Sequence, residues 1–279
     1  MSTNKFFLSF SATETFKTCQ RKYYYNYIAK LPKKHWPWLT FGTFNHLVLE
    51  KFHNYIIYLK KKSIQYDKKD LMKRAFYSAI RKTSRLANNG KQVALTEKQL
   101  DESKKLLKRY YEKVMSDEPD ALCTEKYFEI DLGDDLILRG FIDRIDRVND
   151  NTFKIVDYKT SKASYAVDKN DQLNIYAIGF KKTLDNEDVE IFKQLDFIKV
   201  GETSPNNVEG EKHDPLTDDD ILARLKAIGV EIRAKIASDK NESDWKPTDN
   251  DFCFCCDFKE ACYRERGIYT KEKTGKFKW

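Results

Sequence analysis

The sequence of 279 residues predicts an α/β (α+β) protein in which helices precede and follow a group of strands. Two observations lead to this prediction. Capping and turn residues delimit helices through the first 116 positions, whereas apolar and polar residues alternate between positions 124 and 159. Helical segments then return near 168–183 and 217–237. The 41% hydrophobic content supports a packed globular core.

Four helices are expected before the strands. The first spans 11–28 and opens with a capping box formed by Ser11 and Glu14. The other three are expected at about 41–60, 69–87 and 96–116, and the turn Asn88-Asn89-Gly90 separates the last two.

Strands are expected across 124–159 and at about 190–200. Within the first segment, Asn149-Asp150-Asn151 is expected to form the turn of a hairpin. A helix at 168–183 separates the strands, and 201–215 is expected to be a mobile loop. Thr217 caps a last helix that runs through Ala237.

Two strand segments each end in an acid, at Asp143 and at Asp157, and Lys159 follows the second acid. Because side chains alternate along a strand, Asp157 and Lys159 emerge on one face while Tyr158 points away. Pairing across the hairpin could bring Asp143 close to Asp157, and two apposed acids repel unless a cation lies between them. Carboxylates are ligands for a hard divalent ion, and an ammonium group can polarise attacking water. The alternative is an exposed strand pair with ordinary surface charges.

Other polar residues could serve the same cleft. Gln172 and Tyr176 lie four positions apart on one face of the 168–183 helix. His46 could bind a metal through its imidazole with Glu50 as an orienting partner, although a single histidine on an amphipathic helix is usually structural. Glu125, at the start of the preceding strand, ranks below these residues.

The six cysteines form a second group of interest: Cys19, Cys123, Cys253, Cys255, Cys256 and Cys262. The spacing Cys253-x2-Cys256-x5-Cys262 lets three thiolates converge on one inorganic centre, which needs a fourth ligand. Cys255 ranks below its neighbours, and Cys123 is expected to be a small buried hydrophobe. Spacing alone leaves zinc open. A disulfide scaffold is disfavoured, because we predict no signal peptide and a reducing, cytoplasmic location.

Charge gives weak support for a nucleic-acid partner, because 51 basic and 44 acidic residues leave a net charge of only +7. The stretch 30–38 mixes lysines with Trp36 and Trp38, a combination that can neutralise phosphates and stack unpaired bases. The alternative, favoured for at least one indole, is burial against the core. The tail 263–279 is either a phosphate-binding arm or a solvated end. No apolar run approaches the ~20 residues that cross a bilayer, so no membrane association is expected.

The order of these motifs resembles the RecB-like branch of the PD-(D/E)XK nucleases, and within it the iron–sulfur members of helicase–nuclease complexes and of CRISPR adaptation. The matching motifs are Cys19, Gly-x3-His at 42–46, Gly-x-Ile-Asp-Arg at 140–144, Val-Asp-Tyr-Lys at 156–159, Gln-x3-Tyr at 172–176 and the terminal cysteines. The resemblance covers almost the whole chain, although Ile142 replaces the proline of the family name.

The resemblance implies a restriction-endonuclease-like core with a central mixed β-sheet flanked by helices. It implies a single unit over 1–279, a helical insertion at 61–118 and a cluster region at 253–262 that includes Cys19. The implied roles are Mg²⁺ or Mn²⁺ binding by His46, Asp143, Asp157 and the carbonyl of Tyr158, catalysis by Lys159, and substrate positioning by Gln172 and Tyr176. A 4Fe-4S cluster on Cys19, Cys253, Cys256 and Cys262 is also implied, with structural Zn²⁺ as the alternative.

The function expected from this resemblance is a DNA exonuclease that prefers single-stranded ends. One alternative is an overhang-trimming endonuclease that works with a helicase or integrase partner. Another is a catalytically silent DNA-binding subunit. The chain contains no Gly-x4-Gly-Lys-Ser/Thr phosphate loop, so any DNA unwinding is expected from a partner.

Overall fold

The computed structural model describes residues 5–34, 36–161, 171–184, 186, 188–203, 217–238 and 241–268. The chain divides into two compact units. Unit 1 comprises Met1–Lys34, Leu132–Ile137 and Ala223–Trp279, and unit 2 comprises His35–Asp131 and Leu138–Leu222. The organisation of 1–279 as one functional unit with an insertion at 61–118 stays a prediction.

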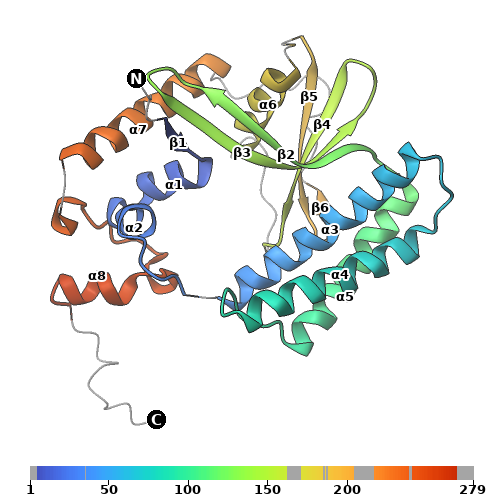
Figure 1. Ribbon diagram of the computed structural model, residues 1–279, viewed down its shortest axis with the longest axis horizontal. Helices are drawn as coiled ribbons and strands as arrows, with labels where there is room; N and C mark the ends of the chain where they lie inside the picture. Colours follow the sequence, from blue (N-terminus) through green and yellow to red (C-terminus); the bar gives the residue numbers. More distant parts are fainter. Residues whose placement is uncertain are drawn as a thin grey trace. The chain divides into compact units, whose positions relative to one another are not determined.

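A mixed β-sheet forms the centre of unit 2 (Figure 1). Its strands are β2 (Asp120–Asp131), β3 (Leu136–Arg147), β4 (Thr152–Lys159), β5 (Glu190–Phe197) and β6 (Glu202–Thr203). β3 pairs antiparallel with β4, β4 parallel with β5, and β5 antiparallel with β6, while β2 pairs with β3. The predicted α/β class with a central mixed sheet is confirmed.

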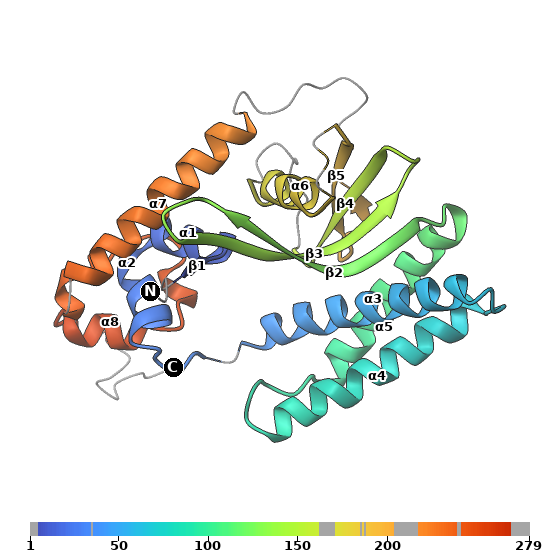
Figure 2. The same cartoon turned by 45° about the horizontal axis from the view of Figure 1, so that its top comes forward.

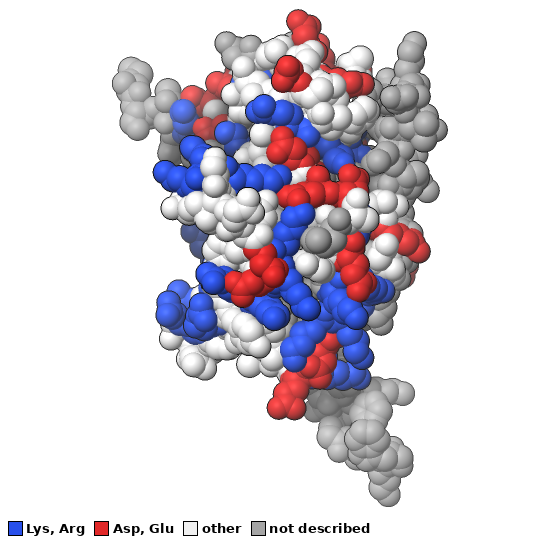
Figure 3. All heavy atoms as spheres, turned by 90° about the vertical axis from the view of Figure 1, so that its right-hand side faces the viewer, with Lys and Arg blue, Asp and Glu red and all other residues white. Residues whose placement is uncertain are grey.

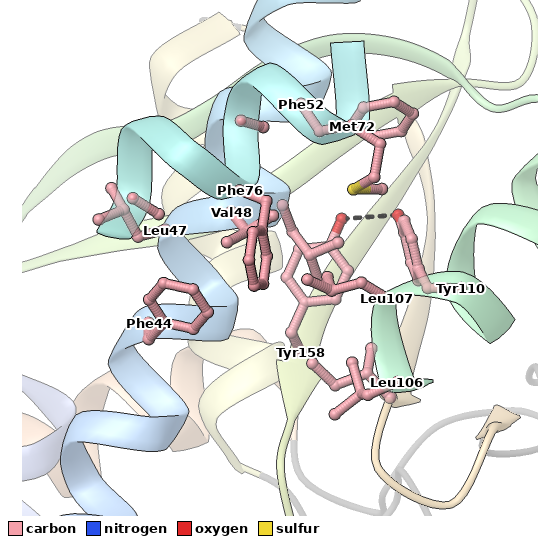
Figure 4. Close-up of a cluster of buried hydrophobic side chains, with 14 of the residues drawn as sticks. Phe44, Leu47, Val48, Phe52, Met72, Phe76, Leu106, Leu107, Tyr110 and Tyr158 are labelled. Carbon is pink, nitrogen blue, oxygen red and sulfur yellow. Dashed lines mark hydrogen bonds between the residues drawn. The ribbon is translucent and has the colours of Figure 1, made fainter. Parts of the chain in front are cut away.

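Helices cover both faces of this sheet. They are α3 (Pro37–Lys61), α4 (Lys68–Asn88), α5 (Glu97–Ser116) and α6 (Asp171–Leu184). Figure 2 shows α6 on one face and α3, α4 and α5 on the other. On the second face, side chains of the three helices pack around Val156 and Tyr158 of β4 (Figure 4).

Several helix boundaries differ from those expected. α3 begins at Pro37, one turn earlier than predicted, because proline at the first helical position loses no intrahelical hydrogen bond. Of the predicted 168–183 helix, residues 168–170 lie outside the described part. The expected loop at 201–215 is described only to Thr203, and the tail is described only to Ile268.

Unit 1 contains β1 (Phe6–Leu8), which pairs with β3, and most of α7 (Asp218–Ser238). Its other elements are α1 (Phe10–Thr18), α2 (Gln20–Tyr23), the π-helix η1 (Tyr24–Ile28), the short 3-10 helices η3 (Glu242–Asp244) and η4 (Cys253–Cys255), and α8 (Lys259–Glu265). Trp245 is fully buried there and stacks on Tyr23, with ring centroids 5.8 Å apart. In the described residues, no helix is both long and apolar enough to cross a membrane.

The single helix predicted over 11–28 is wrong. Cys19 has an extended backbone that ends α1, and its sulfur then accepts a hydrogen bond from the Lys22 N–H at the start of α2. The first helix is also capped by Ser9 rather than Ser11, because the Ser9 hydroxyl accepts from the Ala12 N–H at 3.2 Å.

A buried arginine lies under the sheet face that packs against α3 and α5. Arg144 on β3 is only 3% exposed and makes two hydrogen bonds to Asp146, at 2.8 and 3.0 Å. Its guanidinium also donates to the hydroxyls of Tyr110 on α5, at 2.5 Å, and Tyr158, at 2.6 Å. Burial, and next the positive charge of Arg144, lower the pKa of His53 on α3. The imidazole is therefore neutral, and its Nε2 accepts a hydrogen bond from Arg144 at 3.2 Å. A buried cation is thus fully surrounded by hydrogen-bond acceptors.

Replacing Asp146 with alanine is expected to lower the free energy of unfolding by about 3 to 5 kcal/mol, because the guanidinium of Arg144 would stay buried without its carboxylate. Urea denaturation monitored by circular dichroism measures the change. The matched control is Asp101→Ala, which breaks the exposed ion pair with Lys104 and should leave the free energy of unfolding nearly unchanged. Similar losses in both variants would contradict the structural role of Asp146.

Candidate active site

The register between β3 and β4 brings the two predicted acids to the same level. Arg144 pairs with Val156, so the next residues along the strands are Asp143 and Asp157. The N–H of Tyr158 donates to Oδ2 of Asp143 at 2.9 Å. The Tyr158 side chain lies on the opposite face, in the network of Arg144, so only its backbone is available near the acids.

His46 on α3 approaches the same group, with its Nδ1 3.3 Å from Oδ2 of Asp143. His46 and Asp143 line a cavity of about 620 Å³ together with Glu125 from β2. Glu125 has a left-handed backbone, with φ of 48°, inside an otherwise regular strand. The residue with this unusual backbone conformation is therefore also one that lines the cavity.

Lys159 connects the acids to α6. Its Nζ lies 2.6 Å from Oδ2 of Asp157 and donates to Oε1 of Gln172 at 3.1 Å. The amide nitrogen of Gln172 donates in turn to the hydroxyl of Tyr176, at 2.5 Å. The four-residue spacing on α6 therefore places Gln172 and Tyr176 side by side, and the glutamine joins them to the lysine.

The carboxylates of this site crowd one another. Burial, and then the charge of Asp143, raise the pKa of Asp157 to about 6, although Lys159 opposes the shift. Burial, and then Asp143 and Glu50, raise the pKa of Glu125 to about 7. For His46, burial favours the neutral ring, but the hydrogen bond and charge of Asp143 outweigh it and raise the pKa. Such shifts are typical of functional sites in which negative charge is incompletely balanced.

The donor set fits a hard divalent cation. Apart from its ion pair with Lys159, the buried Oδ2 of Asp157 accepts no hydrogen bond from any described residue. Carboxylate oxygens with an imidazole nitrogen suit Mg²⁺ and Mn²⁺. Within the described part of the chain, however, no three His, Cys, Asp or Glu side chains already stand in ion-binding positions. Small side-chain movements would have to accompany binding.

The cysteines form a separate group within unit 1. A small cavity of about 30 Å³ is lined by Cys19, Cys253, Cys256 and Cys262. The sulfur of Cys19 accepts hydrogen bonds from the N–H groups of Lys22 and Thr248, both at 3.4 Å. Backbone N–H bonds to sulfur are a feature by which proteins tune iron–sulfur centres.

The two remaining cysteines differ from these four. Cys255 is not among the described residues that line the cavity, and its sulfur lies 3.4 Å from the carbonyl of Phe252. Cys123 on β2 is half-buried rather than fully buried, so its expected place in the core is wrong. The structure therefore separates four thiols from two.

Sequence reasoning placed the tryptophans less well. The preferred burial of at least one indole in the core is wrong, because Trp38 is 52% exposed and Trp36 is half-buried. Trp38, Leu39 and Lys199 all line the cavity of His46 and Asp143. The mixture of cations and indoles in the sequence was the one signal for this position.

Basic side chains do not form a continuous surface on the face shown in Figure 3, where Lys and Arg are interleaved with Asp and Glu. Elsewhere in the described residues of unit 2, lysines are paired with acids, as Lys60 and Lys68 are with Glu118. Charge on this face alone therefore does not identify a nucleic-acid path.

The pKa values of Asp157 and Glu125 predict how the metal-free protein responds to pH. Both values are raised on folding, so their contribution favours the folded state in acid and is lost as the pH rises from about 4 to about 7. Over this pH range, the free energy of unfolding of Asp157→Asn should fall by about 2 kcal/mol less than that of the wild type. Glu125→Gln should differ from the wild type in the same direction.

Urea denaturation in chelator from about pH 4.5 to pH 7.5 measures this difference. The exposed acid Asp101 supplies the control variant Asp101→Asn, which should follow the wild-type profile. If Asp157→Asn and Glu125→Gln showed the same pH dependence of stability as the wild type, crowding of the acids would be excluded.

Comparisons with known proteins identify the family of the chain. Residues 7–263 match the PD-(D/E)XK nuclease superfamily. A stretch of 43 residues, or 15% of the chain, is 42% identical to an ATP-dependent helicase/deoxyribonuclease subunit from Streptococcus pyogenes serotype M49 (strain NZ131), and the same values hold for the protein from serotype M1. The chain spans only 4% of the length of these relatives.

The crystal structure of a presumed exonuclease from Eubacterium rectale is similar with a TM-score of 0.48 and 12% identity, over 98% of this chain and 95% of that one. The superfamily match, in contrast, spans residues 7–263 and so nearly the whole chain. The chain belongs to the PD-(D/E)XK nuclease superfamily.

Proposed function

We propose that the protein is a metal-dependent deoxyribonuclease that hydrolyses phosphodiester bonds and prefers single-stranded DNA ends. The observation that carries this proposal is the convergence of Asp143, Asp157 and Lys159 at the end of the β3–β4 pair. Membership of the nuclease superfamily supports it. An exonuclease mode and the preference for single strands are the finer parts of the proposal.

The proposed metal ligands are His46, Asp143, Asp157 and the carbonyl of Tyr158. When bound there, Mg²⁺ or Mn²⁺ would supply Lewis-acid polarisation of the phosphate and a more acidic water. Of these residues, Asp143 is held by the N–H of Tyr158 and approached by His46. A carboxylate fixed in this way keeps its second oxygen available for a cation.

Lys159 is the proposed catalytic lysine. Asp157 and Gln172 hold its ammonium group from two sides, so the charge is fixed before substrate arrives. A preorganised positive group stabilises the negative charge that develops as phosphorus is attacked. Gln172 and Tyr176 would then position the strand, because their polar ends lie beside this ammonium.

Glu125 adds a third acid to the cavity of His46 and Asp143. We propose that it binds water of the metal shell, and that metal binding would return its raised pKa toward the ordinary range. The complete set of acids, histidine and lysine favours an enzyme over a silent DNA-binding subunit. An endonuclease acting with a helicase or integrase partner is distinguished from an exonuclease by the products it makes.

We further propose a 4Fe-4S cluster on Cys19, Cys253, Cys256 and Cys262. The support is their shared cavity and the N–H groups directed at Cys19. The role would be structural, since it joins segments far apart in the sequence. Zn²⁺ bound by the same four thiolates is the alternative.

Asp157→Ala and Lys159→Ala should both greatly slow cleavage of a linear single-stranded DNA in Mg²⁺. Loss of a metal ligand should reduce the rate below detection, and loss of the fixed ammonium should reduce it by about 100-fold or more. Gel analysis of end-labelled DNA measures the rate, and short products that accumulate from the first time point indicate digestion from ends. The control is Lys104→Ala on an exposed surface of α5, and wild-type rates in both site variants would exclude the assignment.

Protein purified without air should be brown and contain iron and sulfide in nearly equal amounts. Cys262→Ser should lose the colour, because it removes one of the four thiols that line the cavity. Cys255→Ser and Cys123→Ser are matched controls that should keep it. A colourless wild-type protein with bound zinc would replace the cluster by a zinc site and leave the nuclease proposal intact.

A further inference from the structure

Two stacked indoles, of which Trp38 is exposed and Trp36 half-buried, lie at the start of α3. The rings of Trp36 and Trp38, on either side of Pro37, are stacked with centroids 4.3 Å apart and planes inclined by 24°. Trp38 is 52% exposed, and the next residue, Leu39, is 55% exposed. Adjacent large apolar side chains with this much exposure are typical of a binding surface.

This aromatic pair is continuous with the candidate active site. Trp38 and Leu39 line the same cavity as His46 and Asp143. A ligand that stacked on Trp38 could therefore belong to the same molecule that reaches the acids.

The turn that carries the indoles is anchored from α5. The side-chain amide of Gln99 donates to the carbonyl of Pro37 at 3.0 Å. The same Gln99 side chain accepts from the N–H of Thr96 at 3.0 Å and so completes the capping box of α5. An aromatic surface that is fixed before binding loses little conformational entropy when a ligand stacks on it.

The cavity holds one lysine beside the exposed indole, together with the acids Glu125 and Asp143. Lys199 lines the cavity with Trp38, and its ammonium lies 5.2 Å from the ring centroid of Phe41 and 2.8 Å from Glu102. Since Lys199 is paired with Glu102, a phosphate here would depend on the proposed metal ion, while the indole offers a face on which an unpaired base can stack.

We propose that Trp38, backed by Trp36, stacks an unpaired nucleobase of the strand whose phosphate lies at the acids. This inference rests on the proposed nuclease function and names the feature that selects single strands. A base in a duplex is already paired and stacked, so its face is not available to the indole.

Binding is tested in the Asp157→Ala background, where DNA should remain uncut. Fluorescence anisotropy compares a short thymidine oligomer with an oligomer of the same length that lacks bases. Trp38→Ala should raise the Kd for the thymidine oligomer by about 5-fold to 100-fold, and Trp38→Phe should raise it less. The base-free oligomer should bind with a Kd that neither change alters. Tyr58→Ala, which removes an aromatic ring that is 59% exposed elsewhere on α3, is the matched control.

The outcomes separate the two proposals. If the wild-type protein cuts the thymidine oligomer but Trp38→Ala and Trp38→Phe bind it normally, stacking is excluded and the nuclease function stands. If Trp38→Phe raised the Kd of both oligomers equally, base stacking would also be excluded. If the wild-type protein binds neither oligomer and cuts no DNA, both proposals fail.

Discussion

The antiparallel register of β3 against β4 is the constraint on which the rest of unit 2 depends. It sets Asp143 level with Asp157 on one side and directs Arg144 and Tyr158 to the other. A shift by one residue would exchange the two sides, burying the acids among apolar side chains and exposing the arginine. Core packing and site geometry are therefore consequences of one pairing.

Charge is compensated on one side of this strand pair and left incompletely compensated on the other. Arg144 is buried with a carboxylate and two hydroxyls within hydrogen-bonding distance, so its charge is fully compensated. On the other side, Asp143 and Asp157 are held close together, with Lys159 and His46 next to them. Well-satisfied polar contacts on the first side can hold the strands against the repulsion on the second. Strain of this kind is common where a fold positions residues for ligand binding.

Local rules predicted most elements and the centre of the site. Side-chain alternation placed Asp157 and Lys159 together, and helical spacing placed Gln172 beside Tyr176. What local rules missed depends on tertiary contacts. Burial of Arg144 contradicts the usual exposure of arginine, and the left-handed backbone of Glu125 leaves no mark in the composition of its strand. Likewise, the break at Cys19 comes from a sulfur atom that caps the next helix. The roles of the site residues and cysteines stay predictions.

The division of unit 1 among distant segments has a consequence for biosynthesis. Cys19 and the cavity-lining cysteines of the carboxyl-terminal region are separated by more than two hundred residues, which include all of unit 2. At about 5 to 20 residues per second, the ribosome needs on the order of tens of seconds to make that stretch. The sheet and helices of unit 2 can consequently form during translation, while the first 34 residues must wait for their partners.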